Sequence, residues 1–167
     1  MTLLGADIRD KLAGILRGRS FVVIGMGNRL AGDDGIGAVV AEELERILGR
    51  ERVWDAGMSL ENHLARLVKI IPDVVIIIDS VEMGRSAGEM DIFLLEEARG
   101  GIFSHSISPS LLGDILDMIG VKNKVLIGIQ PSRVELGEGL SDEVRKAKGI
   151  LASIFADILK EEMVGNN

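Results

Sequence analysis

Residues 74–80 read VVIIIDS, and the apolar run Val74 to Ile78 decides the fold class. A strand that buries only one face alternates apolar and polar side chains, whereas this run is apolar throughout. An uninterrupted apolar run of this length is expected where helices cover both faces of a parallel sheet. The segment therefore predicts a central strand of an α/β sheet.

The segments on either side of this strand alternate between strand and helix patterns. Short apolar runs predict further strands at 21–24, 52–54, 90–95 and 125–129, of which 90–95 is expected to be an antiparallel edge strand. Apolar residues at helical spacing predict helices at 7–16, 34–48, 60–70, 110–119 and 141–163. This alternation predicts an α/β fold of three layers, αβα, with a mostly parallel twisted sheet.

The bulk properties of the chain restrict its partners. The length of 167 residues suits one domain over 1–167, with 1–19 as an N-terminal helical extension. A net charge of −7 disfavours binding to nucleic acid and to anionic membrane surfaces. The aromatic content of 3% offers few anchors for a permanent interface, so we expect a monomer.

Targeting signals and cysteine usage restrict the location and the metal chemistry. The first 19 residues lack the continuous apolar stretch of a signal peptide, and the run at 74–78 is too short to span a bilayer. We therefore expect a cytoplasmic protein without membrane insertion. The chain has no cysteine, so a metal site must use oxygen and imidazole nitrogen ligands.

The glycine-rich segment after the first strand, GMGNRLAGDDGIG at 25–37, carries two adjacent acids, Asp33 and Asp34. It contains part of the dinucleotide fingerprint G-x-G-x-x-G, but Leu30 stands where the third glycine is required. Two acids at the following helix start would also repel a pyrophosphate group. The glycines predict a backbone that a ligand can approach closely. We interpret Asp33 as a helix cap or as support for a neighbouring ligand.

Asp79 follows the strongest strand, and His105 lies between the weak strand at 90–95 and the next helix. Ligands of parallel α/β sheets bind beyond the carboxyl ends of the strands, so Asp34 and Asp79 are expected at neighbouring strand ends. Imidazole is a common metal ligand and an acid–base group near neutral pH. A lone Asp or His is more often structural, and His105 gains weight only from the two carboxylates. The other histidine, His63, is interpreted as solvated or supporting.

Asp34, Asp79 and His105 together would supply two oxygen ligands and one nitrogen ligand. Such a set suits nickel, zinc or manganese better than a soft metal. Three protein ligands with a vacant position are typical of a catalytic metal. The serines around His105 raise the alternative of a serine nucleophile, but no G-x-S-x-G turn surrounds them.

In order along the chain, these motifs resemble a known family, the nickel-iron hydrogenase maturation endopeptidases. Its opening signature is similar to Gly25-Met26-Gly27-Asn28 followed by Gly32-Asp33-Asp34-Gly35-Ile36-Gly37. The resemblance covers about 21–131 and continues through Ile78-Asp79-Ser80, Glu82-Met83-Gly84, Gly88-Glu89, the His105 segment ending at Pro109, and Gly128-Ile129-Gln130-Pro131. The motifs at 82–84 and 128–131 are most similar to the branch that serves formate-hydrogenlyase-type hydrogenases. The stretch before Phe21 is longer than the family pattern.

The resemblance implies a hydrolase, an endopeptidase that removes a C-terminal extension from the hydrogenase large-subunit precursor after nickel insertion. The family's three metal-contacting positions fall on Asp34, Asp79 and His105, which would be both the catalytic residues and the metal ligands. The first of these positions is Glu in some members and Asp in others. The nickel would be supplied by the precursor, which would also be the protein partner.

Two other function classes remain open from the sequence. A metal-dependent hydrolase of another substrate would carry its own stoichiometric ion. A non-enzymatic nickel carrier or assembly chaperone would bind nickel tightly without cutting a peptide bond. The chain has no His-rich tract of the kind that carriers often contain, which disfavours the carrier.

Overall fold

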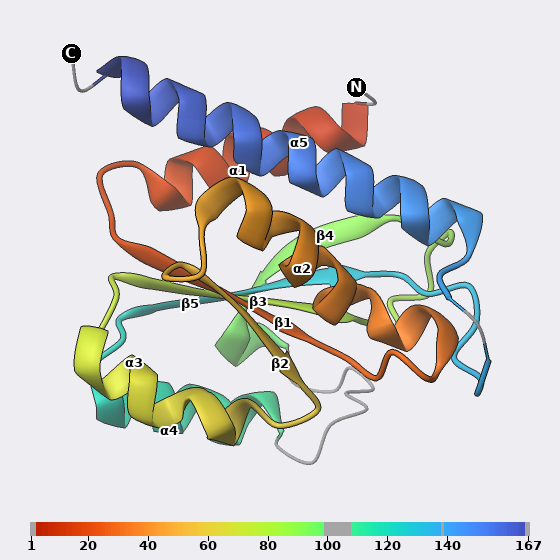
Figure 1. The fold of residues 1–167 in the computed structure, drawn as a ribbon, viewed down its shortest axis with the longest axis horizontal. Coiled ribbons are helices and arrows are strands. Elements are labelled where there is room, and N and C mark those ends of the chain that lie inside the picture. The colour runs from red at the N-terminus through yellow and green to blue at the C-terminus, as the bar shows by residue number, and fades with distance from the viewer. Residues whose placement is uncertain (1–2, 99–107, 138, 166–167) are drawn as a thin grey trace.

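The computed structural model describes residues 3–98, 108–137 and 139–165. Figure 1 shows one sheet between two layers of helices, which confirms the predicted three-layer fold. One face is covered by α1 (Leu3–Leu16), α2 (Ile36–Leu48) and α5 (Asp142–Gly165). The other face is covered by α3 (Leu64–Ile70) and α4 (Pro109–Ile119).

The sheet has five strands in the order β2-β1-β3-β5-β4. They are β1 (Phe21–Met26), β2 (Val53–Gly57), β3 (Val74–Ser80), β4 (Met90–Leu94) and β5 (Asn123–Ile129). All neighbouring pairs are parallel except β4 with β5, so the antiparallel edge strand is confirmed. The chain proceeds from β1 to β2 on one side and to β3 on the other. The edge between β1 and β3 is therefore a topological switch point, where α/β sheets bind ligands.

Two apolar cores explain why the central strands are apolar throughout. All seven residues of β3 are buried. Ile76 and Ile78 belong to the core shared with α1, α2 and α5, whereas Val75 and Ile77 face the core on the α3 side. A side chain of this size stabilises the fold by about 1.5–3 kcal/mol when fully buried. Side chains on both faces of β3 are therefore buried, which explains why this strand is apolar.

Helix α1 is packed into the fold as firmly as the central helices. Its residues Ile8, Leu12 and Leu16 are at most 1% exposed and lie in the core with α5 and the sheet. The helix contacts α5 and β4. The predicted apolar stripe of this helix is confirmed, and the N-terminal stretch covers the β4 side of the sheet.

The start of α2 lies directly on the backbone of the sheet. A Cβ atom on Gly37 would come closer than 3.0 Å to the carbonyl oxygens of Met26 and Ile78, and one on Gly25 would overlap Gly37. Gly27, at φ 147°, has no room for a Cβ beside the carbonyl oxygen of Asp34. The sequence predicts that these glycines let a ligand approach the backbone. In the structure they let two segments of the protein's own backbone pack against each other.

Most element boundaries differ from the predictions by a few residues, and three of the differences affect the segments around the predicted site. Strand β3 continues to Ser80, so Asp79 lies inside the strand and not after it. The predicted helix at 34–48 begins as a separate 3-10 turn, η1 (Gly32–Gly35), before α2. The predicted helix at 60–70 is divided into a 3-10 turn, η2 (Leu60–His63), and α3. No helix within the described ranges is long and apolar enough to cross a membrane.

We expect Gly37→Ala to lower the free energy of unfolding by about 3 kcal/mol or more, because overpacking against rigid backbone usually costs about 1–3 kcal/mol and here two carbonyl groups must move. Gly149→Ala in α5 is the matched control, since a Cβ there meets nothing within 4 Å. That variant should gain about 0.5–1 kcal/mol from the better helix former. Urea denaturation of the two variants measures both values, and equal stability would contradict the backbone contact.

Candidate active site at the carboxyl edge of the sheet

Two of the predicted site residues converge at the switch point. Asp34 is 4% exposed and Asp79 is fully buried. The hydroxyl of Ser80 donates a hydrogen bond to Asp34 Oδ1 at 3.0 Å, and the backbone N–H of Ser80 donates to Asp79 Oδ1 at 2.8 Å. The structure therefore brings Asp34 to the serine that directly follows Asp79 in the chain. Ser80 belongs to the motif Ile78-Asp79-Ser80, but the sequence alone indicates no role for its hydroxyl.

The loop after β1 holds Asp34 from its other side. The backbone N–H of Asn28 donates a hydrogen bond to Asp34 Oδ2 at 3.2 Å. The side-chain carbonyl of Asn28 accepts from the backbone N–H of Leu30 at 3.0 Å, an Asx turn that fixes the loop. Both carboxylate oxygens of Asp34 thus have hydrogen-bond donors, which set the orientation of the group.

Asp33 has a different task from its neighbour. It is fully buried, and its Oδ2 accepts hydrogen bonds from the backbone N–H groups of Ser132 at 2.8 Å and Arg133 at 3.1 Å. Ser141 donates twice, from its N–H to Oδ1 at 2.7 Å and from its hydroxyl to Oδ2 at 2.9 Å. Burial alone would raise the pKa of Asp33, but these hydrogen bonds outweigh it and hold the pKa below its ordinary value.

The side chain of Asp33 makes no helix-capping hydrogen bond, so the predicted capping role is wrong. Asp33 instead ties the loop after β5 to the loop after β1. The main chain continues this connection, because Asp33 N–H donates to the carbonyl of Arg133 at 3.0 Å and Gly137 N–H donates to that of Leu30 at 3.1 Å. The two loops are therefore one rigid unit beside Asp34.

Gln130, at the end of β5, organises the loop that follows Ser80. Its side-chain oxygen accepts from the backbone N–H groups of Met83 at 2.7 Å and Arg85 at 3.2 Å. Its side-chain nitrogen donates to Glu82 Oε1 at 2.7 Å. Gln130 is 4% exposed, so this buried amide connects two motifs that are far apart in sequence. Both motifs belong to the family resemblance, but the sequence alone does not show that they are in contact.

The two histidines have separate outcomes. His105, the third predicted ligand, lies outside the described residues, so its place in the site stays a prediction. His63 stacks on Trp54 with ring centroids 5.7 Å apart and 13° between the ring planes. His63 therefore packs against the side chain of Trp54, which lies in β2. Among the described residues, no group of three or more His, Cys, Asp or Glu side chains is placed to hold a metal ion.

The carboxylate pair suits part of a metal-binding site. Carboxylate oxygens are preferred ligands of hard and borderline divalent ions. Two carboxylates oriented by Ser80 and Asn28 supply such oxygens at the ligand-binding edge. Within the described residues, no third His, Cys, Asp or Glu side chain completes the set.

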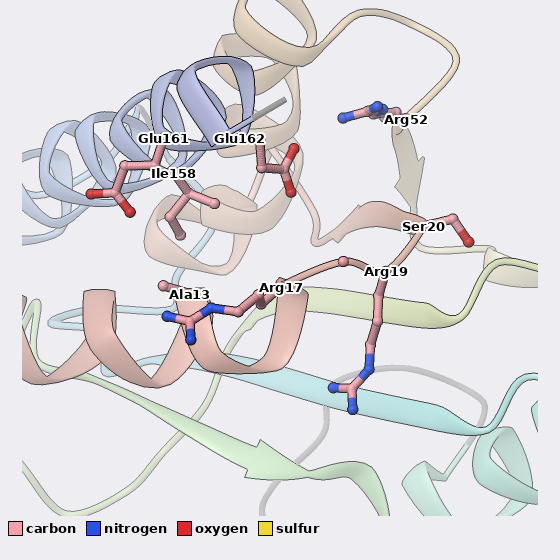
Figure 2. Close-up of a pocket in the computed structure, with 10 residues that line it drawn as sticks. Ala13, Arg17, Arg19, Ser20, Arg52, Ile158, Glu161 and Glu162 are labelled. Carbon is pink, nitrogen blue, oxygen red and sulfur yellow. The ribbon is translucent and has the colours of Figure 1, made fainter. Parts of the chain in front are cut away.

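Figure 2 shows a hollow that lies away from these carboxylates. It has a volume of about 550 Å³ and is lined by Arg17, Arg19 and Arg52 together with Glu161 and Glu162. The three arginines precede β1 and β2, at the amino ends of the strands, and the two glutamates lie in α5. We place the candidate site at the carboxyl edge instead, because the buried carboxylates and the topological switch point coincide there.

Comparison with known proteins gives one consistent family. Residues 38–158 match the family described as hydrogenase maturation protease, HycI. The crystal structure of the [NiFe] hydrogenase maturation protease HycI from Thermococcus kodakarensis KOD1 is 28% identical, with a TM-score of 0.80 over 90% of this chain and 99% of that chain. The hydrogenase maturating endopeptidase HybD from Escherichia coli is also 28% identical, with a TM-score of 0.64 over 85% and 93%. The hydrogenase 3 maturation protease of Escherichia coli K12 is 26% identical over 129 residues, 75% of this chain and 82% of that protein.

Asp33→Asn is expected to reduce the free energy of unfolding at pH 7 by about 1.5–3 kcal/mol, the usual value of hydrogen bonds to a charged group. Because the pKa is lowered in the folded state, this stability is present above the unfolded-state pKa of about 3.9 and is lost as the pH falls through the folded-state pKa. The difference between wild type and variant should therefore shrink in acid. Urea denaturation at pH 7 and at successively lower pH measures it, with the exposed Asp114→Asn as control. A difference that stays constant with pH would contradict the assignment.

Gln130→Glu is expected to loosen the loop after Ser80, because the new carboxylate would face Glu82 where an amide donated before. The backbone N–H groups of Met83 and Arg85 should then exchange with deuterium faster. Adding Glu82→Gln to this variant exchanges the two side chains. The amide at position 82 can then donate a hydrogen bond to the carboxylate at position 130. The double variant should regain protection, and failure to do so would show that the Gln130–Glu82 pair does not order the loop.

Proposed function

Because the chain belongs to the hydrogenase maturation protease family, and is therefore an endopeptidase of the hydrogenase maturation type, we propose that Asp34, Asp79 and His105 direct its cut to a nickel-loaded precursor. The bond cleaved lies at the C-terminal extension of a nickel-iron hydrogenase large subunit. The observation that carries the proposal is the hydrogen bond from the Ser80 hydroxyl to Asp34, which brings Asp34 to the residue after Asp79 at the switch point of the sheet. The family resemblance supplies His105 as the third member.

In this proposal, nickel is part of the substrate. Asp34 is held by Ser80 and Asn28 so that its carboxylate faces the edge where the precursor arrives. Asp79, within β3, cannot move without the sheet and gives the second fixed oxygen ligand. A metal at such a position polarises the scissile carbonyl or activates a water molecule. The contribution of this chain is to bind and orient the nickel-bearing end of the precursor.

A two-carboxylate site that is completed by the substrate acts as a checkpoint. A precursor without nickel offers these carboxylates no ion to bind, so its scissile bond is not positioned. Positioning of reacting groups accounts for a large share of enzymatic rate acceleration. The extension is thus removed only from a precursor that already holds its metal.

Further parts of the proposal follow the sequence and its relatives. The motifs at 82–84 and 128–131, together with the similarity to hydrogenase 3 maturation protease, support a client of the formate-hydrogenlyase type. We place the reaction in the cytoplasm and assign it to a monomer that docks one precursor. Size-exclusion chromatography with light scattering measures the oligomeric state, and a dimeric enzyme would contradict that assignment.

We expect Asp34→Asn, Asp79→Asn and His105→Ala each to lower the rate of precursor cleavage by at least about 100-fold, as for removal of a group that positions or stabilises the reacting centre. Cleavage of purified precursor is followed by its mobility shift on a gel, with and without nickel loading. Asp33→Asn should retain far more activity than Asp34→Asn when assayed at a temperature where both are folded. The exposed Asp10→Asn is the neutral control.

The outcomes separate the function classes. Shortening of only the nickel-loaded precursor supports both the endopeptidase activity and the checkpoint. Cleavage regardless of nickel points to a hydrolase with its own metal. Binding of nickel or precursor without cleavage points to a carrier or chaperone. Full activity of Asp79→Asn or His105→Ala would show that the assigned trio is wrong.

A further inference from the structure

Three large apolar side chains are exposed beside the candidate site. Leu30 is 72% exposed, Val134 49% and Leu136 86%. Leu30 lies in the loop after β1, and the other two lie in the loop after β5. The N–H of Gly137 donates a hydrogen bond to the carbonyl of Leu30 at 3.1 Å, so the two segments adjoin. We name Leu30, Val134 and Leu136 the apolar rim.

The apolar rim is held in place by buried contacts. Asp33 binds the segment 132–141 through Ser132, Arg133 and Ser141. A single exposed leucine is ordinary, but adjoining exposed apolar residues on rigid loops mark an interaction surface. A surface that is already ordered loses less conformational entropy when a partner binds.

The apolar rim is continuous with the carboxylates. Asn28 donates to Asp34 through its backbone and accepts from the N–H of Leu30 through its side chain. One residue therefore connects the proposed nickel ligand to the rim. The apolar rim is therefore within reach of a chain segment whose scissile bond lies at Asp34.

Positive charge lies on the same loop, where Arg133 directly precedes Val134. A cavity of about 540 Å³ is lined by Arg133, Gly139, Leu140, Ser141, Asp142 and Arg145. The guanidinium of Arg145 binds Asp142 and the carbonyl of Leu140. The guanidinium of Arg133 makes no hydrogen bond or ion pair with another described residue. It is therefore the cation on this loop that is available to an anionic group.

We propose that the apolar rim and Arg133 dock the C-terminal extension of the precursor, an inference that rests on the proposed function. Every C-terminal extension ends in a carboxylate, which matches the charge of Arg133. Apolar side chains of the extension cover Leu30, Val134 and Leu136, and the terminal carboxylate pairs with Arg133. The extension thus lies on one side of Asp34 and the nickel-bearing body of the precursor on the other.

Steady-state cleavage of nickel-loaded precursor tests the apolar part. Leu30→Glu and Leu136→Glu should each raise KM about tenfold or more, with kcat within about twofold of wild type, because a buried leucine contact contributes at least that much to binding. Met118→Glu on α4 is the matched control, since Met118 is 87% exposed on another face. All of these side chains are exposed, and a thermal melt verifies that each variant is folded.

A synthetic peptide of the extension tests the charged part by fluorescence anisotropy. Wild type should bind the free-acid peptide several-fold more tightly than its C-terminal amide. Arg133→Gln should bind both forms with the same lower affinity, whereas Lys160→Gln, at the distant end of α5, should behave as wild type. Equal binding of acid and amide by wild type would overturn the assignment of the terminal carboxylate to Arg133.

The outcomes for the docking surface are distinct from those for the function. If wild type cleaves the precursor and the two leucine variants keep its KM, the docking surface is wrong and the proposed function stands. Equal affinity of wild type for the precursor and for the mature subunit without its extension would also overturn the docking surface. If wild type does not cleave the loaded precursor at all, the proposed function fails, whatever the peptide binding shows.

Discussion

The contact between the backbone of α2 and the backbones of β1 and β3 is the constraint on which the site depends. Gly37 allows it, because any Cβ at that position would overlap carbonyl groups of both strands. The helix start is thereby lowered onto the sheet edge, and Asp34 comes within 3.0 Å of the hydroxyl of Ser80. Side chains in that interface would separate helix and sheet by several ångströms, and Asp34 would no longer reach the hydroxyl of Ser80.

The adjacent acids Asp33 and Asp34 have different roles. Asp33 is structural, and Asp34 is the proposed nickel ligand. The 3-10 turn directs Asp33 toward the loop after β5 and Asp34 toward β3. The hydrogen bonds to the side chain of Asp33 come from donors within the protein, and they lower its pKa. Asp34 lies at the switch point, with one oxygen oriented by Asn28 and the other by Ser80. Burial of an acid is therefore not by itself a sign of function, and the donors around it distinguish the two roles.

The loops of the carboxyl edge support one another through buried polar groups. Gln130 joins β5 to the loop after β3, and Asp33 joins the loop after β5 to the loop after β1. Each polar group is satisfied inside the protein, which gives these loops the rigidity that a positioning site requires. The motifs at 82–84 and 128–131 are thus one structural unit. This contact explains why both motifs are present, although they lie far apart in the chain.

The sequence by itself determined the layers, the helical faces, the antiparallel edge strand and the arrival of Asp34 and Asp79 at the same edge. These features depend on apolar periodicity and on the direction of parallel strands, both of which are local or follow from simple topology. The motifs also identified the family. Only the tertiary structure decided that Asp33 binds a loop about a hundred residues away, that the glycines accommodate backbone, and that Gln130 meets Glu82. Those outcomes depend on which segments meet in space, and local pattern carries no information about such long-range pairing.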